Sequence, residues 1–282
     1  MQTPNFSVVT PSRNSGKYLE DAILSVAQQK GVTVEHIVQD SLSSDNTLEV
    51  LRRHPCVRWQ WESDCGQSDA INRGFLRATG DLVGWLNADD YYLPGGLAAI
   101  AKAAAEHPEA DVFHGDCVFV DKKGSIVRSK VEHDFDHDIL FYFGCYIPST
   151  ATFFRRRLIE RGYLLDCDFR VCMDFEYFVR LAGAGFQFHY LPRFIAAFRW
   201  HEENISLQQA ERRLYERLEV QRRYGTQARS QAQMELLRQS ARMKRIFLKL
   251  ASGNEFVANF LDSAFADVNL RCDLSFRCTV FE

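Results

Sequence analysis

The stretch Leu82-Val83-Gly84-Trp85-Leu86 runs directly into Asn87-Ala88-Asp89-Asp90. A short apolar run that ends abruptly in polar residues is typical of a buried strand. Comparable runs lie on both sides of it in the sequence, and segments with helical periodicity separate them. Because strands that alternate with helices form βαβ units, the pattern predicts an α/β fold with a mostly parallel central sheet.

This alternation extends over the first 125 residues. Strands are expected at 6–10, 36–39, 57–61, 82–86 and 112–120, and helices at 17–29, 46–53, 68–78 and 94–105. A turn at Lys122-Lys123-Gly124 predicts a hairpin into 126–128. The later sequence is less regular and rich in aromatic residues. Further helices are expected at 174–184, from 207 to a break at Tyr224-Gly225, and at 227–250.

The composition is that of an ordinary globular chain, with 46% hydrophobic and 25% charged residues among 282. The net charge of −3 is unevenly distributed along it. Residues 1–140 hold 13 Lys and Arg against 21 Asp and Glu, whereas residues 206–250 hold 11 against 4. The acidic first part argues against a chain-wide nucleic-acid interface, so no nucleic-acid partner is expected. The basic segment is a separate feature that needs its own explanation.

No apolar run reaches the roughly 20 residues needed to cross a bilayer, and the first residues do not resemble a signal peptide. A cytoplasmic protein is therefore expected. The eight cysteines include no Cys-x-x-Cys pair. We expect buried or idle free thiols rather than a disulfide framework or a zinc site.

Short segments rich in polar side chains follow each of the first four predicted strands. They are Thr10, Pro11 and Ser12 after the first, Asp40 after the second, Glu62 and Asp64 after the third, and Asn87, Ala88, Asp89 and Asp90 after the fourth. Ligands of such sheets bind outside the carboxyl ends of the strands. Carboxylates gathered there repel each other unless a cation or hydrogen-bond donors offset the charge. The pattern predicts Mn²⁺ or Mg²⁺ together with a phosphorylated or polyhydroxylated ligand.

The stretch 66–74 begins the third predicted helix and has two interpretations. Helix starts attract phosphate, so Asp69 and Arg73 are candidate ligand contacts. The preceding Gln67-Ser68 is also ordinary capping material.

Met173-Asp174-Phe175-Glu176 begins a later helix and is equally open. Asp174 is either a helix cap or a general base that takes a proton from an incoming hydroxyl. Glu176 either pairs with Arg180 on the helix surface or serves as the alternative base. His201 gains a functional role only if its loop returns to the acidic strand ends.

Taken in order, these motifs resemble family 2 glycosyltransferases of the GT-A fold. The resemblance covers residues 6 to about 206 and rests on the motifs at 7–14, 40–47, 66–74, 80–90, 173–176 and 199–201. Each motif is modest alone, but their common order is specific. The resemblance implies a GT-A, Rossmann-like single domain with a mostly parallel sheet and a C-terminal helical extension.

The resemblance also implies a role for each motif. Nucleotide-sugar contacts would come from Thr10, Pro11, Ser12, Asp40, Asp69, Arg73, Asn87, Ala88 and Asp89. The metal would be held by Asp89 and Asp90, with His201 near the metal and the diphosphate. Asp174 matches the catalytic base. The implied cofactor is Mn²⁺ or Mg²⁺.

Three positions depart from the family pattern. Asn87 stands where the first acid of the D-x-D motif is usual, which predicts a lower metal affinity. Ser41 and Leu42 replace the usual glycines after Asp40, so the shape of that loop is open. Met173 replaces the acid that often precedes the base, so Asp174 would act without an adjacent carboxylate.

The implied reaction is the inverting transfer of a sugar, of hexosyltransferase type and metal-dependent. The donor would be a nucleoside-diphosphate sugar, with a UDP-sugar as first choice, and the acceptor a hydroxyl of a saccharide or lipid-linked molecule. Cell-surface polysaccharide or glycan biosynthesis is the expected setting, with acceptor contacts among 140–170. Two alternatives stay open: a nucleotidyltransferase, and a non-catalytic nucleotide- or carbohydrate-binding module.

We expect a catalytic domain over 1–206, with a nucleotide-binding half of about 1–125 and an acceptor-side half of about 126–206. A basic helical extension would cover 207–282. For its segment 207–250 two interpretations are open. It contacts an anionic membrane surface at the inner face of the cytoplasmic membrane, or it packs on the catalytic domain or on a second copy of the chain.

Overall fold

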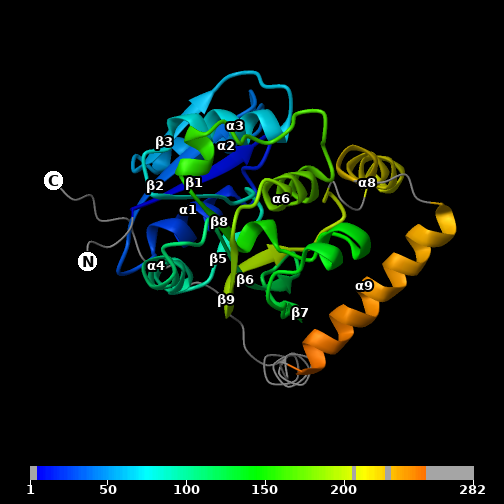
Figure 1. Ribbon diagram of the computed structural model, residues 1–282. Helices are drawn as coiled ribbons and strands as arrows, with labels where there is room; N and C mark the ends of the chain where they lie inside the picture. The colour runs from blue at the N-terminus through cyan, green and yellow to red at the C-terminus, as the bar shows by residue number, and fades with distance from the viewer. Residues whose placement is uncertain (1–4, 205–207, 226–229, 252–282) are drawn as a thin grey trace.

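The computed structural model describes residues 5–204, 208–225 and 230–251 (Figure 1). These residues form a mixed α/β fold around one curled sheet, with the strand order β3-β2-β1-β4-β8-β6-β9-β5 and β7 paired to β6. Two hydrophobic clusters flank the sheet. One includes residues of α3 and α6, and the other includes residues of α1 and α4. The predicted α/β class is confirmed.

The N-terminal half follows the predicted alternation closely. Its elements are β1 (Asn5–Ser12), α1 (Leu19–Ala27), β2 (Thr33–Asp40), α2 (Thr47–Arg53), β3 (Val57–Trp61), α3 (Gln67–Arg77) and β4 (Leu82–Trp85). The four strands pair in parallel in the order β3-β2-β1-β4. The carboxyl ends of these strands therefore meet at one edge of the sheet.

The second half contains shorter and mixed elements. They are β5 (Tyr91–Tyr92), α4 (Gly96–Glu106), β6 (Val112–Val120), β7 (Ile126–Lys130), η1 (Ile139–Phe143), η2 (Ser149–Ala151), β8 (Thr152–Arg155), α5 (Arg157–Glu160), α6 (Met173–Gly183) and β9 (Phe188–Arg199). β5 and β8 were not predicted, because β5 has only two residues and β8 lies in the irregular, aromatic-rich part of the sequence.

Strand β9 brings a distant part of the chain to the strand ends. It runs parallel to β6 and pairs in antiparallel fashion with β5, the short strand that follows Asp90. Its last residue is Arg199, so the segment that follows, including His201, arrives beside the residues after β4. The condition set for a functional His201 is thereby met.

Trp85 lies at the centre of the larger core cluster and is fully buried. Its ring stacks on Phe154 with centroids 5.7 Å apart and an interplanar angle of 7°. Phe178, in α6, stacks on it at 6.5 Å. β4, β8 and α6 therefore share one tightly packed core, which holds the end of β4 in a fixed position.

The helices α8 (Ala210–Tyr224) and α9 (Gln231–Ala251) pack on the rest of the fold. α8 contacts α6, and α9 contacts η1. Leu214 and Leu218 of α8 are exposed, whereas Glu216 and Val220 are buried. The face of α8 that packs on the fold therefore includes a buried carboxylate.

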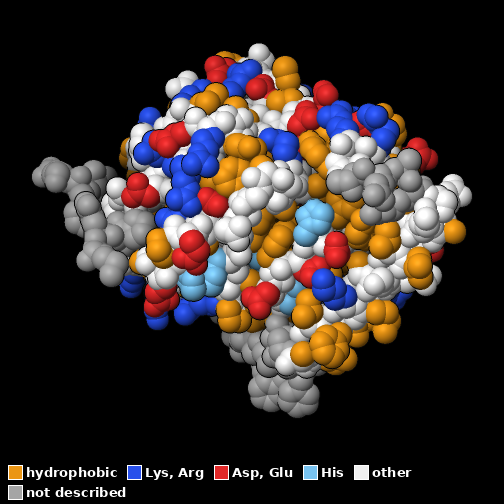
Figure 2. Space-filling view, in the orientation of Figure 1, with side chains coloured by type: hydrophobic (Ala, Val, Ile, Leu, Met, Phe, Trp, Pro, Cys, Tyr) orange, Lys and Arg blue, Asp and Glu red, His pale blue; other side chains and the backbone are white. Residues whose placement is uncertain are grey.

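Basic residues of α9 bind acids of the preceding domain. Arg245 pairs with the fully buried Glu132 at 2.7 Å, and Lys244 pairs with Asp136. On the outer face of α9, large apolar side chains are exposed: Leu236, Met243, Phe247 and Leu250. Figure 2 shows hydrophobic side chains along this edge of the molecule. No helix among the described residues has both the length and the apolar character needed to span a membrane.

Six of the eight cysteines lie within the described residues, and all six are free thiols. Cys117 and Cys172 are buried, whereas Cys56, Cys65 and Cys167 are exposed. Cys272 and Cys278 lie outside the described residues. The expectation of free thiols holds for these six.

Candidate active site

The ends of the first three strands are joined by backbone hydrogen bonds. Ser12 is in register with Asp40, and Asp40 with Trp61. The N–H of Ser41 donates to the Ser12 carbonyl at 2.8 Å, and the N–H of Glu62 donates to the Asp40 carbonyl at 3.0 Å. The structure thus brings the predicted nucleotide-binding residues of β1 and β2 together.

Asp40 is fully buried and shapes its own loop. Its two carboxylate oxygens accept the Ser43 N–H at 2.8 Å and the Ser43 hydroxyl at 2.6 Å. Between them, Leu42 adopts φ +50°, a backbone conformation that favours glycine. The loop that departs from the family pattern therefore keeps a glycine-like turn without a glycine.

The three residues at the end of β1 differ in exposure. Thr10 is fully buried, and its hydroxyl lies 2.8 Å from Nε2 of His36. The hydroxyl of Ser12 is buried and has no hydrogen-bond partner among the described residues. Pro11 is half-buried. Among these three, Pro11 is thus the partly exposed residue, and Ser12 is the one with a buried, unpaired hydroxyl.

Asp69 and Arg73 form an ion pair of 2.9 Å at the start of α3. The Asp69 carboxylate also accepts the backbone N–H of Cys65 at 2.9 Å. Arg73 donates to the Ser63 carbonyl at 2.8 Å and lies 3.3 Å from Glu62. These acids hold the pKa of Arg73 above its usual range, Asp69 contributing most. Its charge is therefore largely compensated within the protein.

Asp90 is fully buried and holds the turn after β4 together. Its carboxylate accepts hydrogen bonds from the Arg199 N–H, the Thr150 hydroxyl and the Asn87 side-chain amide, each at 2.9 Å. Burial and the neighbouring Asp89 raise the pKa of Asp90. The side-chain oxygen of Asn87 in turn accepts a hydrogen bond of 2.8 Å from Nε2 of Gln67, at the start of α3. These contacts favour a structural role for Asp90 rather than direct metal binding.

Asp89 and His201 form a contact in which Asp89 is partly exposed and His201 is buried. Nε2 of His201 lies 2.9 Å from Oδ2 of Asp89, whose side chain is 26% exposed. Asn204 supports both residues, since its side chain accepts the His201 N–H at 2.6 Å and its amide donates to Asp89 at 3.3 Å. The His201 ring stacks on Tyr18 with centroids 5.3 Å apart. Ala88, by contrast, is buried and offers a ligand no polar side-chain atom.

The buried side chain of Arg199 holds the backbone of Asp89 in position. Its guanidinium donates to the Asp89 carbonyl at 2.8 Å and to the Lys122 carbonyl at 3.1 Å. It pairs with Asp21 at 2.6 Å and lies over the Tyr18 ring. A single side chain therefore joins α1, the turn after β4 and the end of β9.

The donor set at this position suits a hard divalent ion only in part. Asp89 and His201 supply an oxygen and a nitrogen within reach of one ion, and Nδ1 of His201 is buried without a partner among the described residues. The described residues contain no group of three or more metal-ligating side chains. Mg²⁺ and Mn²⁺ commonly keep waters and bind substrate phosphates, so a two-residue protein contribution fits that chemistry.

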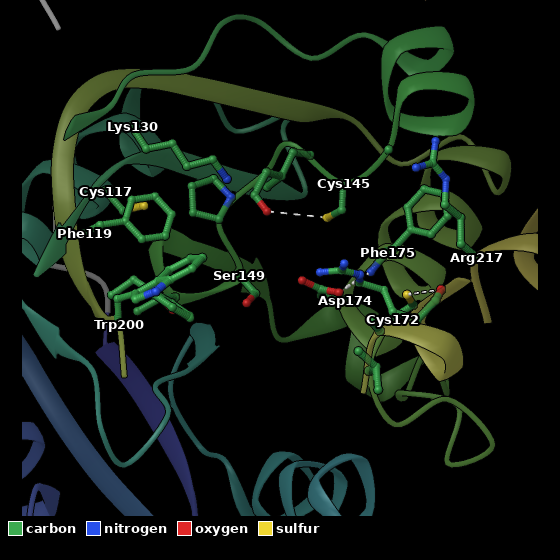
Figure 3. Close-up of a pocket in the computed structure, with 18 of the residues that line it drawn as sticks. Cys117, Phe119, Lys130, Cys145, Ser149, Cys172, Asp174, Phe175, Trp200 and Arg217 are labelled. Atoms are coloured by element: carbon green, nitrogen blue, oxygen red, sulfur yellow. Dashed lines mark hydrogen bonds between the residues drawn. The ribbon is translucent and has the colours of Figure 1, made fainter. Parts of the chain in front are cut away.

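Asp174, in the first turn of α6, lines a cavity of about 680 Å³. Figure 3 shows Lys130, Phe119 and Trp200 on one side of this cavity and Asp174, Cys172 and Arg217 on the other. One Asp174 oxygen accepts the Phe175 N–H at 2.7 Å. Burial raises the pKa of Asp174, although that hydrogen bond and the charge of Lys130 act against the increase. A carboxyl group that lines a cavity and has a raised pKa is suited to accept a proton.

Glu176, the alternative base, lies elsewhere. It is fully buried, binds Arg180 at 2.7 Å and accepts the Tyr224 hydroxyl at 2.6 Å. The expected pair with Arg180 exists, but it is buried on the Glu176 side rather than on the helix surface. Because these partners occupy its oxygens, Glu176 is not placed to act on a substrate.

The cavity and the strand ends are neighbours. Thr150, which binds Asp90, lines the cavity, as does Trp200, which immediately precedes His201. On the other side, the Ser68 hydroxyl at the start of α3 lies 3.2 Å from the sulfur of Met173. The cavity that Asp174 lines therefore adjoins the segments that carry Asp90 and His201.

Comparison with known proteins identifies the family. The model for glycosyl transferase family 2 matches residues 7–163, more than half of the chain. The chain belongs to glycosyl transferase family 2. The match covers every predicted nucleotide-binding residue and ends before Asp174 and His201. The resemblance that the motifs suggested is thus confirmed at the level of the family.

Curated relatives of this family 2 protein are moderately similar. An uncharacterized glycosyltransferase of Nostoc sp. is 28% identical over 57% of this chain and 53% of its own length. A glycosyltransferase of PGL/p-HBAD biosynthesis from Mycobacterium bovis is 29% identical over 64% of this chain and 70% of its own length. The chain thus spans about half of the first of these relatives.

Solved structures confirm the GT-A fold of this family 2 member. TarS 1–349 of S. aureus in complex with UDP-GlcNAc matches with a TM-score of 0.63 and 18% identity, covering 83% of this chain and 70% of that chain. The mannosyltransferase PcManGT of Pyrobaculum calidifontis, in complex with GDP-Man and Mn²⁺, matches with a TM-score of 0.61 and 17% identity. That match covers 94% of this chain and 80% of the other.

Sequence reasoning missed several residues that organise this family 2 site. Arg199 and Asn204 lie in or beside the motif around His201 but were given no role. Lys130, Arg213 and Arg217 line the cavity and come from segments without a recognisable motif. An arginine within a charged helix gives no signal in the sequence that distinguishes a cavity wall from solvent.

Glu216 of α8 is the other residue that was missed. Its carboxylate accepts the backbone N–H groups of Arg170, Val171 and Cys172 at 3.0, 2.8 and 2.8 Å. Arg212 pairs with it at 2.6 Å. The segment immediately before α6 is therefore anchored by a helix that lies beyond the predicted catalytic domain.

Proposed function

We propose that the chain is an inverting glycosyltransferase that moves a sugar from a nucleoside-diphosphate sugar to an acceptor hydroxyl. The observation that carries this proposal is the placement of Asp174 in a cavity that adjoins the Asp89–His201 contact. Asp89 and His201 offer ligands for a cation that can bind a diphosphate. Asp174 offers a carboxylate that can accept the proton of a hydroxyl. Family membership supports the same reaction class.

The donor is bound at the carboxyl ends of β1, β2 and β4 in this proposal. Ser12 and Pro11 face the nucleotide, while Asp40 keeps the adjoining loop in shape. The start of α3, with Asp69 and Arg73, borders the same edge. A UDP-sugar is our first choice of donor, supported by the UDP-GlcNAc complex of a protein with the same fold.

Asp89 and His201 would hold Mn²⁺ or Mg²⁺, with the donor phosphates and water completing the coordination. When bound, the ion supplies Lewis-acid stabilisation of the charge that develops on the leaving diphosphate. Asp90 then acts by ordering Asn87 and the Arg199 backbone rather than as a direct ligand. A Mn²⁺ complex of a structural neighbour supports the choice of metal.

Asp174 takes the proton of the acceptor hydroxyl, whose oxygen attacks the anomeric carbon from the face opposite the diphosphate. Its raised pKa favours proton acceptance near neutral pH over that of an ordinary exposed aspartate. The acceptor lies in the cavity, which holds the hydroxyl and the donor sugar in line. The expected acceptor is a saccharide or a lipid-linked molecule, in cell-surface glycan biosynthesis.

Release of nucleoside diphosphate tests the proposal. UDP-, GDP- and dTDP-sugars are screened with Mn²⁺ for a thermal shift, and the binding donors are then assayed for turnover. Asp174→Asn should reduce turnover by roughly 10²-fold or more while keeping the thermal shift. Asp168→Asn is the matched control. Asp168 is an exposed acid in the loop before α6, and its carboxylate lies 3.7 Å from Arg223 of α8.

The outcomes separate the competing functions. An Asp174→Asn variant with near-normal turnover would rule out the assigned base. Release of pyrophosphate from a nucleoside triphosphate would indicate a nucleotidyltransferase instead. Nucleotide binding without metal and without donor consumption would indicate a binding module. Product anomeric configuration, read by proton NMR, decides between inversion and retention.

The membrane contact predicted for residues 207–250 remains a prediction. Several of the basic residues there bind acids of the same chain, as Arg245 and Lys244 do, which supports packing on the catalytic domain. The exposed stripe of Leu236, Met243, Phe247 and Leu250 is the part that could enter a lipid surface. Flotation with anionic vesicles tests the contact, and Phe247→Ser should abolish it.

A further inference from the structure

We propose that the cavity beside Asp174 binds an acceptor that carries an anionic group, a phosphate or a carboxylate, close to the hydroxyl that receives the sugar. This inference rests on the proposed function, because it names the acceptor class for that site. It is carried by the charges and the aromatic side chains that line the cavity.

The charged side chains of the cavity wall are mostly basic. Lys130, Arg213 and Arg217 line it together with a single acid, Asp174. Arg213 is exposed and Arg217 is half-buried. Both come from α8, whereas Lys130 comes from β7, so the three cations are contributed from two walls. A cavity with this balance attracts an anion.

Lys130 forms a long ion pair with one acid, Glu132, which binds a second cation more closely. Glu132 lies 3.8 Å from Lys130, but both of its oxygens bind Arg245, at 2.9 and 2.7 Å. Its negative charge is thus already compensated by a side chain outside the cavity wall. The charge of Lys130 acts to lower the Asp174 pKa, which places the two side chains within electrostatic reach of each other.

Arg217 is held in a fixed position without an acidic partner among the described residues. It donates to the carbonyls of Tyr142 and Phe143 at 3.0 and 2.6 Å, and its Nε is buried with no partner in the described part of the chain. Burial lowers its pKa. A partly desolvated guanidinium with only carbonyl partners gains more from an anion than an exposed one does.

Aromatic residues form the opposite wall. Phe119, Phe198 and Trp200 pack edge to face with centroids 5.4 to 6.4 Å apart. Trp200 is 49% exposed although it belongs to this cluster. Figure 3 shows it on the side of the cavity away from Arg217. An aromatic face packs against the C–H face of a sugar ring, so the occupant combines a ring with a charged substituent.

The test uses three matched probes: methyl α-glucoside, its 6-phosphate and methyl α-glucuronide. Their affinities are measured by saturation-transfer NMR with UDP and Mn²⁺ present. At least one anionic probe should bind roughly 10-fold or more tightly than the neutral glycoside, and the preference should weaken with salt. A preference for the phosphate alone or for the glucuronide alone tells which anion the cavity takes.

Arg213→Gln should reduce the anionic preference to below about threefold, and Arg213→Lys should keep most of it. Arg222→Gln is the control, because this arginine lies on the same helix but pairs with Glu219 on the surface. Equal binding of all three probes, or an equal effect of the control, would overturn the inference. Thermal unfolding of each variant verifies that it is folded.

Donor hydrolysis in the same samples separates this inference from the function on which it rests. If the anionic preference is present but no nucleoside diphosphate is released, the reaction is wrong and the cavity assignment stands. If the donor is consumed but the preference is missing, the acceptor class is wrong and the reaction stands.

Discussion

The carboxylate of Glu216 accepts the backbone N–H of Cys172 at 2.8 Å, and Cys172 immediately precedes α6. Glu216 accepts two more amide groups from Arg170 and Val171. These hydrogen bonds to a charged acceptor join α8 to the helix that carries Asp174. They also hold Arg213 and Arg217, which flank Glu216 in sequence, at the wall of the cavity.

Replacing this carboxylate should weaken both stability and turnover. Glu216→Ala leaves three amides without their acceptor, which should lower the free energy of unfolding by roughly 2–3 kcal/mol. We also expect a lower kcat with little change in the donor KM, because the base moves while the nucleotide edge does not. Urea unfolding and donor turnover measure the two effects.

A matched variant and pH distinguish this role from general destabilisation. Glu219→Ala, on the same helix, removes an acid that pairs with Arg222 and Arg223 at the surface and should leave kcat unchanged. Because its hydrogen bonds lower the Glu216 pKa overall, the contribution of Glu216 is present above about pH 4.5 and is lost as pH falls through its lowered pKa. An unfolding free energy equally reduced in both variants contradicts this prediction.

The acid limb of the pH profile should depend on Lys130. Burial raises the pKa of Asp174, so activity should decline on acidification at a pH above the ordinary aspartate range of about 4. The Lys130 charge acts to lower that pKa. Lys130→Met should therefore move the limb to higher pH, as measured by kcat/KM for donor hydrolysis between about pH 4 and 9. Lys102→Met, on the exposed face of α4, is the control. A limb that does not move would show that Lys130 and Asp174 are not electrostatically linked.

Loss of either proposed metal ligand should weaken metal binding directly. Asp89→Asn or His201→Ala is expected to raise the Mn²⁺ dissociation constant, in the presence of UDP, by roughly 10-fold or more. Electron paramagnetic resonance of free Mn²⁺ measures this without any turnover. His137→Ala is the control, because this histidine is half-exposed and lies beside Asp138 on the surface. Unchanged Mn²⁺ affinity in both site variants would leave the Asp89–His201 contact with a structural role only.

Gly66, which precedes α3, should tolerate no side chain. It adopts φ +120° and ψ −179°, a conformation that is essentially restricted to glycine. Nothing lies within 4 Å of the position that a Cβ atom would occupy there, so any penalty is backbone strain rather than a clash. Gly66→Ala should lower the free energy of unfolding by about 1–3 kcal/mol. Gly183→Ala, at the end of α6 and equally open, should be neutral or slightly stabilising. Equal effects of the two changes in a urea titration would contradict the assignment of strain.

The sequence alone predicted the parallel half of the sheet well. Strands β1 to β4 and their helices each carry a clear hydrophobic period and a polar end, and these local signals survive in the tertiary structure. The same signals identified the strand ends at Thr10, Asp40 and Asn87 as one edge. The strands β5 and β8 were missed, because β5 has only two residues and β8 lies in an aromatic-rich segment without a regular alternation.

The order of motifs determined the family, and the chemistry of residue types determined which positions were candidates. Which of two adjacent acids faces outward was decided only by the tertiary structure. Asp89 is partly exposed beside His201, whereas Asp90 is enclosed by three hydrogen-bond donors. No local pattern could distinguish them, because two of those donors, Thr150 and Arg199, lie 60 and 109 positions away in the sequence.

The sequence by itself therefore determined the α/β class, the family and the acidic strand ends, since these depend on local periodicity and on motifs. Only the tertiary structure decided that α8 belongs to the site, with Glu216 anchoring the start of α6 and Arg213 and Arg217 lining the cavity. The physical reason is that hydrogen bonds and electrostatic attraction act through space. A basic helix in the sequence acquires a function only through the groups that the fold places against it.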